Sequence, residues 1–273
     1  MLQCAGRGRR TGDCCGTARE YTLTNLNLYG NQLREGAGHS IANVLRENHT
    51  LANLNLSGNE LGEGGAQAIA AALRENRTLT ELDLRNNDLG EGTGQAIAAA
   101  LGVNNTLTNL NLNYNALGEG GVQAIADVLR VNTTLTDLNL RYNDLGEGGG
   151  QAIAAVLRVN NTLTNLDICQ NYMGEGAAQA IGAALRVNTT LTALDLRHND
   201  LGEGGGQAIA AALVVNNTLT NLNLNDLLGE GVKSAVRQSW GNRGGTLELD
   251  AVERRQRSTA ATSLGHGTRA ERP

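Results

Sequence analysis

The chain has 273 residues, with 36 glycines, one proline and no phenylalanine, and its formal net charge is −5. Residues 1–20 contain four arginines and two acidic residues, which gives a charge of +2, and residues 250–273 contain five arginines and three acidic residues, which also gives +2. Residues 21–249 therefore carry a charge of −9. An acidic body argues against nucleic acid as the main partner, and the lack of any run of about 18 apolar residues argues against a membrane span. The first residues have no apolar centre of the kind found in secretory signals, so we expect a cytoplasmic protein.

The N-terminal segment, residues 1–17, is rich in Gly and Arg, fits no repeat and is expected to be disordered. Residues 18–23 echo the junction at residues 73–79 with one residue lost, which suggests the tail of an earlier repeat. Our hypothesis is that the natural array extends upstream or that the gene model is cut. An uncapped first repeat leaves apolar surface and a strand edge open, so self-association there is the alternative to an expected monomer.

A unit of 28 residues then recurs eight times without slippage. The leucine that opens each unit marks the period: Leu23, Leu51, Leu79, Leu107, Leu135, Leu163, Leu191 and Leu219. A fixed period of this size is typical of a solenoid, in which each repeat covers its neighbour.

Within one unit, residues 78–105, the apolar side chains first alternate and then recur every fourth residue. Leu82 and Leu84 alternate with polar residues, which predicts a short strand with one buried face. Ile97 and Leu101 lie four apart, which places them on one helix face. Stacked copies therefore predict an α/β solenoid shaped as a right-handed horseshoe, with parallel strands on the concave side and helices on the convex side.

The last repeat departs from this pattern, with Lys233, Arg237 and Trp240 where Ala and Leu usually stand, as expected of a terminal repeat that caps the stack. Residues 246–249 can add one more short strand. We therefore expect a repeat domain over residues 18–249, followed by a polar, disordered tail over 250–273. We interpret the arginines at 254, 255 and 257 as part of a solvated tail. The alternative interpretation is a nuclear import signal.

The sequence pattern L-x-x-L-x-L-x-x-N, followed by L-G-E-G-G-x-Q-A-I-A, resembles the ribonuclease-inhibitor type of leucine-rich repeat. It is most similar to the leucine-rich regions of NOD-like receptors. It also resembles the repeats of ribonuclease inhibitor and of Ran GTPase-activating protein. The resemblance covers residues 18–243 and implies a binding fold. That fold hosts many unrelated functions, so the resemblance alone does not identify a task.

Three polar columns follow the period, and we interpret all three as structural. The first is expected to be buried, with its amides bonded to the turns of neighbouring repeats: Asn31, Asn59, Asn87, Asn115, Asn143, Asn171 and Asn199. The second places a carboxylate at each helix start, where it meets the positive helix end in preference to collecting cations: Glu35, Glu63, Glu91, Glu119, Glu147, Glu175, Glu203 and Glu230. The third has the spacing of glycosylation sites but is read as helix-to-strand turns: Asn48, Asn76, Asn104, Asn132, Asn160, Asn188 and Asn216.

The four cysteines, Cys4, Cys14, Cys15 and Cys169, form no zinc pattern, and we expect reduced thiols, no metal site and no cofactor. One catalytic arrangement can be written down: Cys169 as nucleophile, His198 as base and Asp195 as orienting group. An open sheet face offers no closed pocket and no oxyanion turn for such chemistry. We therefore do not expect an enzyme.

Sequence differences between the repeats gather on the strand side, at the third, fifth, seventh and eighth positions, which we expect to face the concave surface. Tyr and Arg often anchor interfaces, and an ordinary solvated sheet face with pairs such as Arg141–Asp167 is the alternative. The predicted partner-binding residues are Tyr29, Arg85, Tyr114, Arg141, Tyr142, Asp167, Tyr172, Asp195, Arg197 and His198.

These features predict a non-enzymatic module that binds a protein or peptide on its concave face, with acidic residues setting the charge preference. The resemblance to NOD-like receptors implies sensing or scaffolding, although no G-x-x-x-x-G-K-[ST] motif is present. The alternatives are a regulator that activates a small GTPase and an inhibitor of ribonucleases.

Overall fold

The computed structural model describes residues 23–224, 228–241 and 243–249. The predicted disordered segment 1–17, most of the predicted repeat remnant at 18–23 and the polar tail 250–273 lie outside the described residues. In the described part, no helix is both long and apolar enough to cross a bilayer.

Strands and helices alternate along the chain. The strands have three residues each: β1 (Asn25–Asn27), β2 (Asn53–Asn55), β3 (Glu81–Asp83), β4 (Asn109–Asn111), β5 (Asp137–Asn139), β6 (Asn165–Asp167), β7 (Ala193–Asp195), β8 (Asn221–Asn223) and β9 (Thr246–Glu248). The helices have 11 to 13 residues: α1 (Glu35–Glu47), α2 (Gly62–Leu73), α3 (Glu91–Leu101), α4 (Gly118–Val128), α5 (Gly146–Leu157), α6 (Glu175–Leu185), α7 (Gly202–Leu213) and α8 (Glu230–Trp240).

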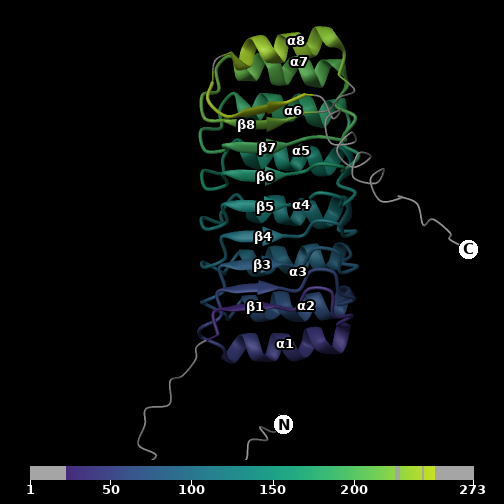
Figure 1. The fold of residues 1–273 in the computed structure, drawn as a ribbon, viewed down its shortest axis with the longest axis vertical. Coiled ribbons are helices and arrows are strands. Elements are labelled where there is room, and N and C mark those ends of the chain that lie inside the picture. Colours follow the sequence, from purple (N-terminus) through teal and green to yellow (C-terminus); the bar gives the residue numbers. More distant parts are fainter. Residues whose placement is uncertain (1–22, 225–227, 242, 250–273) are drawn as a thin grey trace, which may run out of the picture.

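All nine strands form one parallel sheet in sequence order, with the helices stacked in the same order behind it (Figure 1). The register follows the repeat, so Leu82 pairs with Leu110 and Leu110 with Leu138. This arrangement confirms the predicted leucine-rich-repeat solenoid. It also confirms the extra strand after the eighth helix, which pairs with β8.

The core lies between the sheet and the helices and consists mainly of leucine, isoleucine and alanine. Leu82, Leu84 and Ile97 are at most 2 % exposed. Neighbouring helices approach closely where they carry small residues: a Cβ added to Gly94 would lie 2.6 Å from the Cα of Gly121. Because a whole backbone approaches this point, a larger side chain would push α3 and α4 apart.

The first asparagine column bonds each turn to the turn of the preceding repeat, as predicted. The Asn59 Oδ1 accepts the backbone N–H groups of Asn31 and Leu33 at 2.9 and 3.0 Å, and its Nδ2 donates to the Leu28 and Leu56 carbonyls. The same amide pattern recurs at Asn199. Since each amide satisfies backbone groups that are shielded from water, this column supports the stack and is not a binding ladder.

The second asparagine column, which has the spacing of glycosylation sites, forms the helix-to-strand turns on the opposite edge of the sheet. The Asn76 Oδ1 accepts the Thr78 and Leu79 N–H groups at 3.0 and 2.8 Å, and its Nδ2 donates to the Leu45 carbonyl at 2.8 Å. Asn76 is 2 % exposed. The predicted structural role is therefore confirmed.

The glutamate column lies in the first helical turns, as predicted, but its carboxylates reach the next repeat. The described helices show no side-chain hydrogen bond that caps their own N-terminus. Instead, Glu147 Oε2 accepts the Gly174 N–H, at the start of α6, at 3.0 Å. A Cβ on Gly176 would lie 2.3 Å from Glu147 Oε1. From α2 to α7, the glycine that follows each glutamate thus makes room for the carboxylate of the repeat before.

At the C-terminal end, α8 closes the stack with side chains unlike those of the other helices. Trp240 is 6 % exposed, and the Arg243 guanidinium lies 5.7 Å from its ring centroid. Arg243 also donates to the Leu213 carbonyl, the position that an asparagine amide occupies in earlier repeats. The last repeat is therefore atypical in the way that a capping repeat requires.

Candidate functional site: the concave strand face

Two adjoining hollows lie along the strand face. The first has a volume of about 440 Å³ and is lined by Asn25, Leu26, Asn27, Asn53, Leu54, Asn55, Glu81, Leu82, Asp83, Asn109, Leu110, Asn111, Asp137 and Asn139. The second, of about 210 Å³, is lined by Asp137, Asn139, Asn165, Leu166, Asp167, Ala193, Leu194, Asp195, Asn221 and Asn223. The lining residues include five carboxylates and no Lys or Arg, so the surface is open and anionic.

Part of this lining has a structural role that the repeat pattern alone does not predict. At the fifth repeat position, a side-chain oxygen accepts the backbone N–H two residues later: Asn139 from Arg141 at 3.0 Å and Asp167 from Cys169 at 3.0 Å. The same contact links Asp195 to Arg197. These turns end each strand, and Asn and Asp serve equally well because both present an acceptor oxygen.

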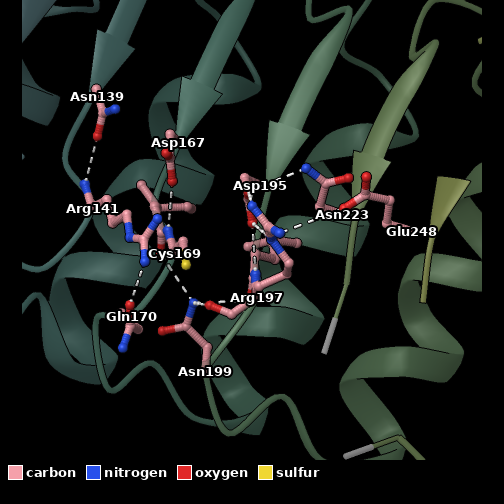
Figure 2. A network of polar contacts seen from close by, with 12 residues as sticks. Asn139, Arg141, Asp167, Cys169, Gln170, Asp195, Arg197, Asn199, Asn223 and Glu248 are labelled. Atoms are coloured by element: carbon pink, nitrogen blue, oxygen red, sulfur yellow. Dashed lines mark hydrogen bonds and ion pairs between the residues drawn. The ribbon is translucent and has the colours of Figure 1, made fainter. Parts of the chain in front are cut away.

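Asp195 and Arg197 form an ion pair at the C-terminal end of this face (Figure 2). The Arg197 Nε lies 3.0 Å from both carboxylate oxygens of Asp195, and the Arg197 side chain also reaches Glu248 at 3.5 Å. The pair is well shielded, with the Asp195 side chain 12 % exposed and Arg197 25 % exposed. The hydrogen bond to Asp195 raises the pKa of the Arg197 guanidinium above its ordinary value.

A second group of predicted residues meets beside the ends of β4, β5 and β6. The rings of Tyr114 and Tyr142 lie with their centroids 4.7 Å apart and tilted by 47°. The Arg141 guanidinium is 5.7 Å from the Tyr142 ring centroid, and its Nη2 donates to Gln170 Oε1 at 2.8 Å. Gln170 donates in turn to the Tyr142 hydroxyl. We name Tyr114, Arg141, Tyr142 and Gln170 the tyrosine cluster.

The tyrosine cluster corrects one expected contact and adds one residue. If the strand face were an ordinary solvated surface, Arg141 would be expected to pair with Asp167. Instead, Arg141 donates to Gln170, and no ion pair joins it to Asp167 in the described part of the chain. Gln170 was not among the predicted site residues. The sequence could have identified Gln170 as a site residue, because it occupies the same repeat position as Tyr114, Tyr142 and His198.

That eighth repeat position has a left-handed backbone. The φ angles are 60° at Tyr114, 55° at Tyr142, 55° at Gln170 and 55° at His198. Glycine occupies the position in the first two repeats, as at Gly58 with φ 64°. A side chain here costs roughly 1–2 kcal/mol relative to glycine. Repeats four to seven therefore keep large or polar side chains where the backbone alone would favour glycine.

Other predicted site residues stand apart from the tyrosine cluster. Tyr29, 60 % exposed, packs its ring over Gly58 near the N-terminal end. Tyr172 is 75 % exposed, and His198 is exposed on the next repeat. Arg85 is half-buried beside β3. Among the described residues, no side-chain hydrogen bond, ion pair or ring contact joins any of these four to the cluster.

The structure contradicts the placement of Cys169 on the open face. It is 1 % exposed, although other residues at the seventh repeat position, such as Arg85 and Arg141, are half-buried. Burial, followed by the charge of Asp195, raises the pKa of the Cys169 thiol to about 12. The thiol is therefore protonated at neutral pH, and the Cys169–His198–Asp195 nucleophile arrangement is wrong.

Asp167, Cys169 and Asp195 bring three ligand-type atoms within 4.8 Å of one another. These residues fit a metal ion poorly, because the Arg197 guanidinium already occupies the Asp195 carboxylate and its positive charge opposes a cation there. Burial raises the pKa of the Asp167 carboxyl, the Cys169 N–H lowers it, and the charge of Asp195 raises it further. The group is better described as a partly shielded polar network than as a metal centre.

Comparisons with known proteins agree with the architecture. The family model described as "Leucine Rich repeat" matches residues 47–70, 75–98, 103–126, 131–154 and 187–210. No curated protein matches the sequence. Among solved structures, the leucine-rich repeat-containing protein LegL7 from Legionella pneumophila is 20 % identical, with a TM-score of 0.56 over 84 % of this chain and 74 % of that one.

A more distant likeness is to the tropomodulin C-terminal domain of Caenorhabditis elegans, which is 13 % identical, with a TM-score of 0.42 over 62 % of this chain and 86 % of that one. Leucine-rich repeats commonly serve as protein-interaction modules, and the matched segments carry that repeat five times. Together, the register of the sheet, the asparagine columns and the matched repeats show that the chain is a leucine-rich-repeat solenoid.

Proposed function

We propose that this solenoid is a non-enzymatic protein-interaction module that binds an extended protein segment along its concave strand face. The observation that carries the proposal is the lining of the two hollows, which contains five carboxylates and many amides but no basic residue. Such a surface favours a segment with cationic side chains, since unlike charges steer association and set specificity.

The tyrosine cluster provides an anchor at the rim of this face. Tyr114 is 56 % exposed, and Tyr142 contacts the Tyr114 ring, the Arg141 guanidinium and the Gln170 amide. Rigid aromatic side chains lose little conformational entropy on binding, which makes them effective contact residues. Asp167 contributes mainly charge, because one of its oxygens already accepts an internal hydrogen bond. The charge of Asp195 is offset by the Arg197 guanidinium.

The resemblance to NOD-like receptors supports a sensing or scaffolding role for the same face. Activation of a small GTPase and inhibition of a ribonuclease remain the alternative roles, and both would also use a protein partner. Two direct assays separate them: acceleration of GTP hydrolysis by candidate GTPases, and loss of ribonuclease activity in the presence of the chain.

A labelled peptide with alternating arginines tests the charge preference of the strand face. About ten residues span roughly 33–36 Å when extended, enough to cross most of nine strands spaced about 4.8 Å apart. We expect saturable binding measured by fluorescence anisotropy, with the affinity falling as salt is raised, because exposed charges are screened. A matched peptide with glutamate in place of arginine should bind at least about tenfold more weakly.

Two variants connect this binding to the named residues. Asp137→Asn combined with Asp167→Asn removes charge with residues that occur naturally in these columns, and Tyr142→Gly removes the anchor without backbone strain. Each should weaken peptide binding, whereas Gln151→Ala on the helix face should not. Equal binding of the arginine and glutamate peptides, or full binding by both strand-face variants, would refute the proposal.

A further inference from the structure

A column of exposed valines runs along the edge of the solenoid where the helices end. The column consists of Val103, Val131, Val159, Val187 and Val215, which are 49 %, 70 %, 57 %, 54 % and 49 % exposed, and it is extended by Val214 at 68 %. We name these six residues the valine edge. It lies at the opposite edge of the sheet from the tyrosine cluster, because it precedes the strands, whereas the cluster follows them.

The fold does not require valine at this position. In the first two repeats the equivalent residues are Glu47 and Glu75, which are also exposed at the ends of α1 and the turn after α2. The column valines lie in the turns after α3 to α7, and at this exposure they bury little apolar surface. Five successive repeats therefore keep an apolar side chain where the structure accepts a charged one.

The second asparagine column holds the valines in register. Each of the five column valines, from Val103 to Val215, directly precedes a buried asparagine. These asparagines bond repeat to repeat: Asn104 Nδ2 donates to the Leu73 carbonyl at 2.8 Å and to the Asn76 carbonyl at 3.2 Å. Asn216 makes the same two contacts with Leu185 and Asn188. The hydrogen bonds of these asparagines thus hold the valines at a regular spacing. The valines form a continuous apolar stripe and not a set of isolated exposed residues.

The charge beside this stripe is positive. Arg130, Arg158 and Arg186 directly precede Val131, Val159 and Val187, and residues 102–106, 130–134, 158–162, 186–190 and 214–218 contain no Asp or Glu. Asp127 lies 3.7 Å from Arg130. Arg158 and Arg186 have no carboxylate within ion-pair distance among the residues that the structure describes. In a protein with a net charge of −5, this edge is locally cationic and apolar.

We infer that the valine edge is a second docking surface, which binds an amphipathic protein segment whose apolar stripe is flanked by carboxylates. The apolar stripe would cover the valines, and its carboxylates would pair with Arg158 and Arg186. A second copy of the valine edge fits less well, because its segments 130–134, 158–162 and 186–190 contain arginines and no carboxylate to pair with Arg158 and Arg186. An anionic membrane is also disfavoured, because the acidic body of the chain would be repelled from it.

A designed peptide tests this inference without knowledge of the natural partner. The probe is a synthetic amphipathic helix with a leucine stripe flanked by glutamates, and its control has lysines in place of the glutamates. Titrated against the full chain, the glutamate peptide should bind saturably and at least about tenfold more tightly than the lysine peptide, since charge complementarity sets the difference. The triple variant Val131→Glu, Val159→Glu and Val187→Glu should abolish that binding while keeping the melting temperature, because glutamate already occupies this position in two repeats.

Val44→Glu is the matched control, because Val44 is 62 % exposed but lies on α1 outside the column, and it should bind like the wild type. Three outcomes would overturn the inference: equal affinity for both peptides, unchanged binding by the triple variant, or no saturable binding. Binding to phosphatidylserine vesicles that the triple variant loses, or a wild-type dimer in sedimentation velocity that it loses, would reassign the surface to a membrane or to a second copy. Because the arginine peptide and the strand-face variants probe the other surface, either proposal can fail without the other.

Discussion

The rings of Tyr114 and Tyr142 touch with centroids 4.7 Å apart, although the two residues are one full repeat apart in sequence. The contact exists because adjacent strands pair in register, which brings equivalent positions of neighbouring repeats side by side. Both residues also have left-handed φ angles, so the site combines an aromatic contact with a backbone conformation that disfavours side chains. Substitutions at this position can therefore separate the stabilising aromatic contact from the destabilising backbone strain.

Glycine and alanine at position 142 should therefore have different effects. Tyr142→Gly loses an aromatic contact of about 0.5–1.5 kcal/mol but relieves the strain of the left-handed backbone, so its free energy of unfolding should stay close to the wild-type value. Tyr142→Ala loses the contact and keeps the strain, so it should be less stable than the glycine variant by about 1 kcal/mol. Urea unfolding at equilibrium measures both, and an alanine variant as stable as the glycine variant would contradict the role of strain.

The buried asparagine column makes a second prediction. Asn171 is fully buried, accepts the Asn143 N–H at 2.8 Å and donates to the Leu140 carbonyl at 2.9 Å. Asn171→Ala leaves several buried backbone groups unpaired and should lower the free energy of unfolding by about 2–4 kcal/mol. Asn31→Ala, at the exposed first position of the same column, should cost less than about 1 kcal/mol. Similar losses in the two variants would show that burial does not govern the column.

A third prediction concerns Asp167, whose pKa burial raises above its ordinary value. A carboxyl with a raised folded-state pKa favours its protonated form in the fold, so its stabilising contribution is lost as the pH rises through that pKa. Asp167→Asn keeps the acceptor for the Cys169 N–H and removes the charge, as asparagine does in neighbouring repeats. Its melting temperature at pH 7 should exceed the wild-type value, because the variant has no carboxylate charge to shield from water.

The advantage of Asp167→Asn should disappear below pH 3.8, the ordinary pKa of the carboxyl, because the wild-type group is then protonated in both states. The exposed Asp200→Asn variant, measured at the same pH values, is the control for the removal of one surface charge. An advantage that persists in acid would mean that packing, and not charge, explains the effect.

The thiol of Cys169 should be unreactive in the folded protein. Its pKa is raised to about 12 by burial and by Asp195, so the thiolate population at pH 8 is negligible. Alkylation by iodoacetamide, located by peptide mass spectrometry to separate Cys169 from the N-terminal cysteines, should proceed only after denaturation. Rapid alkylation of the native chain would show that the thiol is accessible and ionised.

The Cys169 thiol also makes the free energy of unfolding depend on pH. The sign is opposite to that of a carboxylate whose pKa is lowered by folding. The unfolded thiol ionises near its ordinary value of 9.0, whereas the folded one does not until about 12. Stability contributed by Cys169 is therefore present below pH 9.0 and lost as the pH rises toward 12. The difference in the free energy of unfolding between the wild type and Cys169→Ala should narrow over that range, and a constant difference would refute the assignment.

The period of 28 residues was sufficient to predict the strands, the helices, their parallel order and the structural role of both asparagine columns. This succeeded because a repeat imposes the same environment on equivalent residues, so alternation in one unit predicts the buried face of all of them. The prediction was less accurate within the site. Cys169 and Arg85 share a repeat position, yet the first is buried and the second is half-exposed.

The repeat sequence by itself thus determined the architecture, since burial of leucines spaced by one period admits one way of stacking. Only the tertiary structure decided which polar side chains bond to each other, that Arg141 reaches Gln170 and not Asp167, and that the valines align on one edge. Those contacts depend on side-chain direction and on backbone turns between strand and helix. Neither is encoded in a hydrophobic period, because both are set by the neighbouring repeats through space.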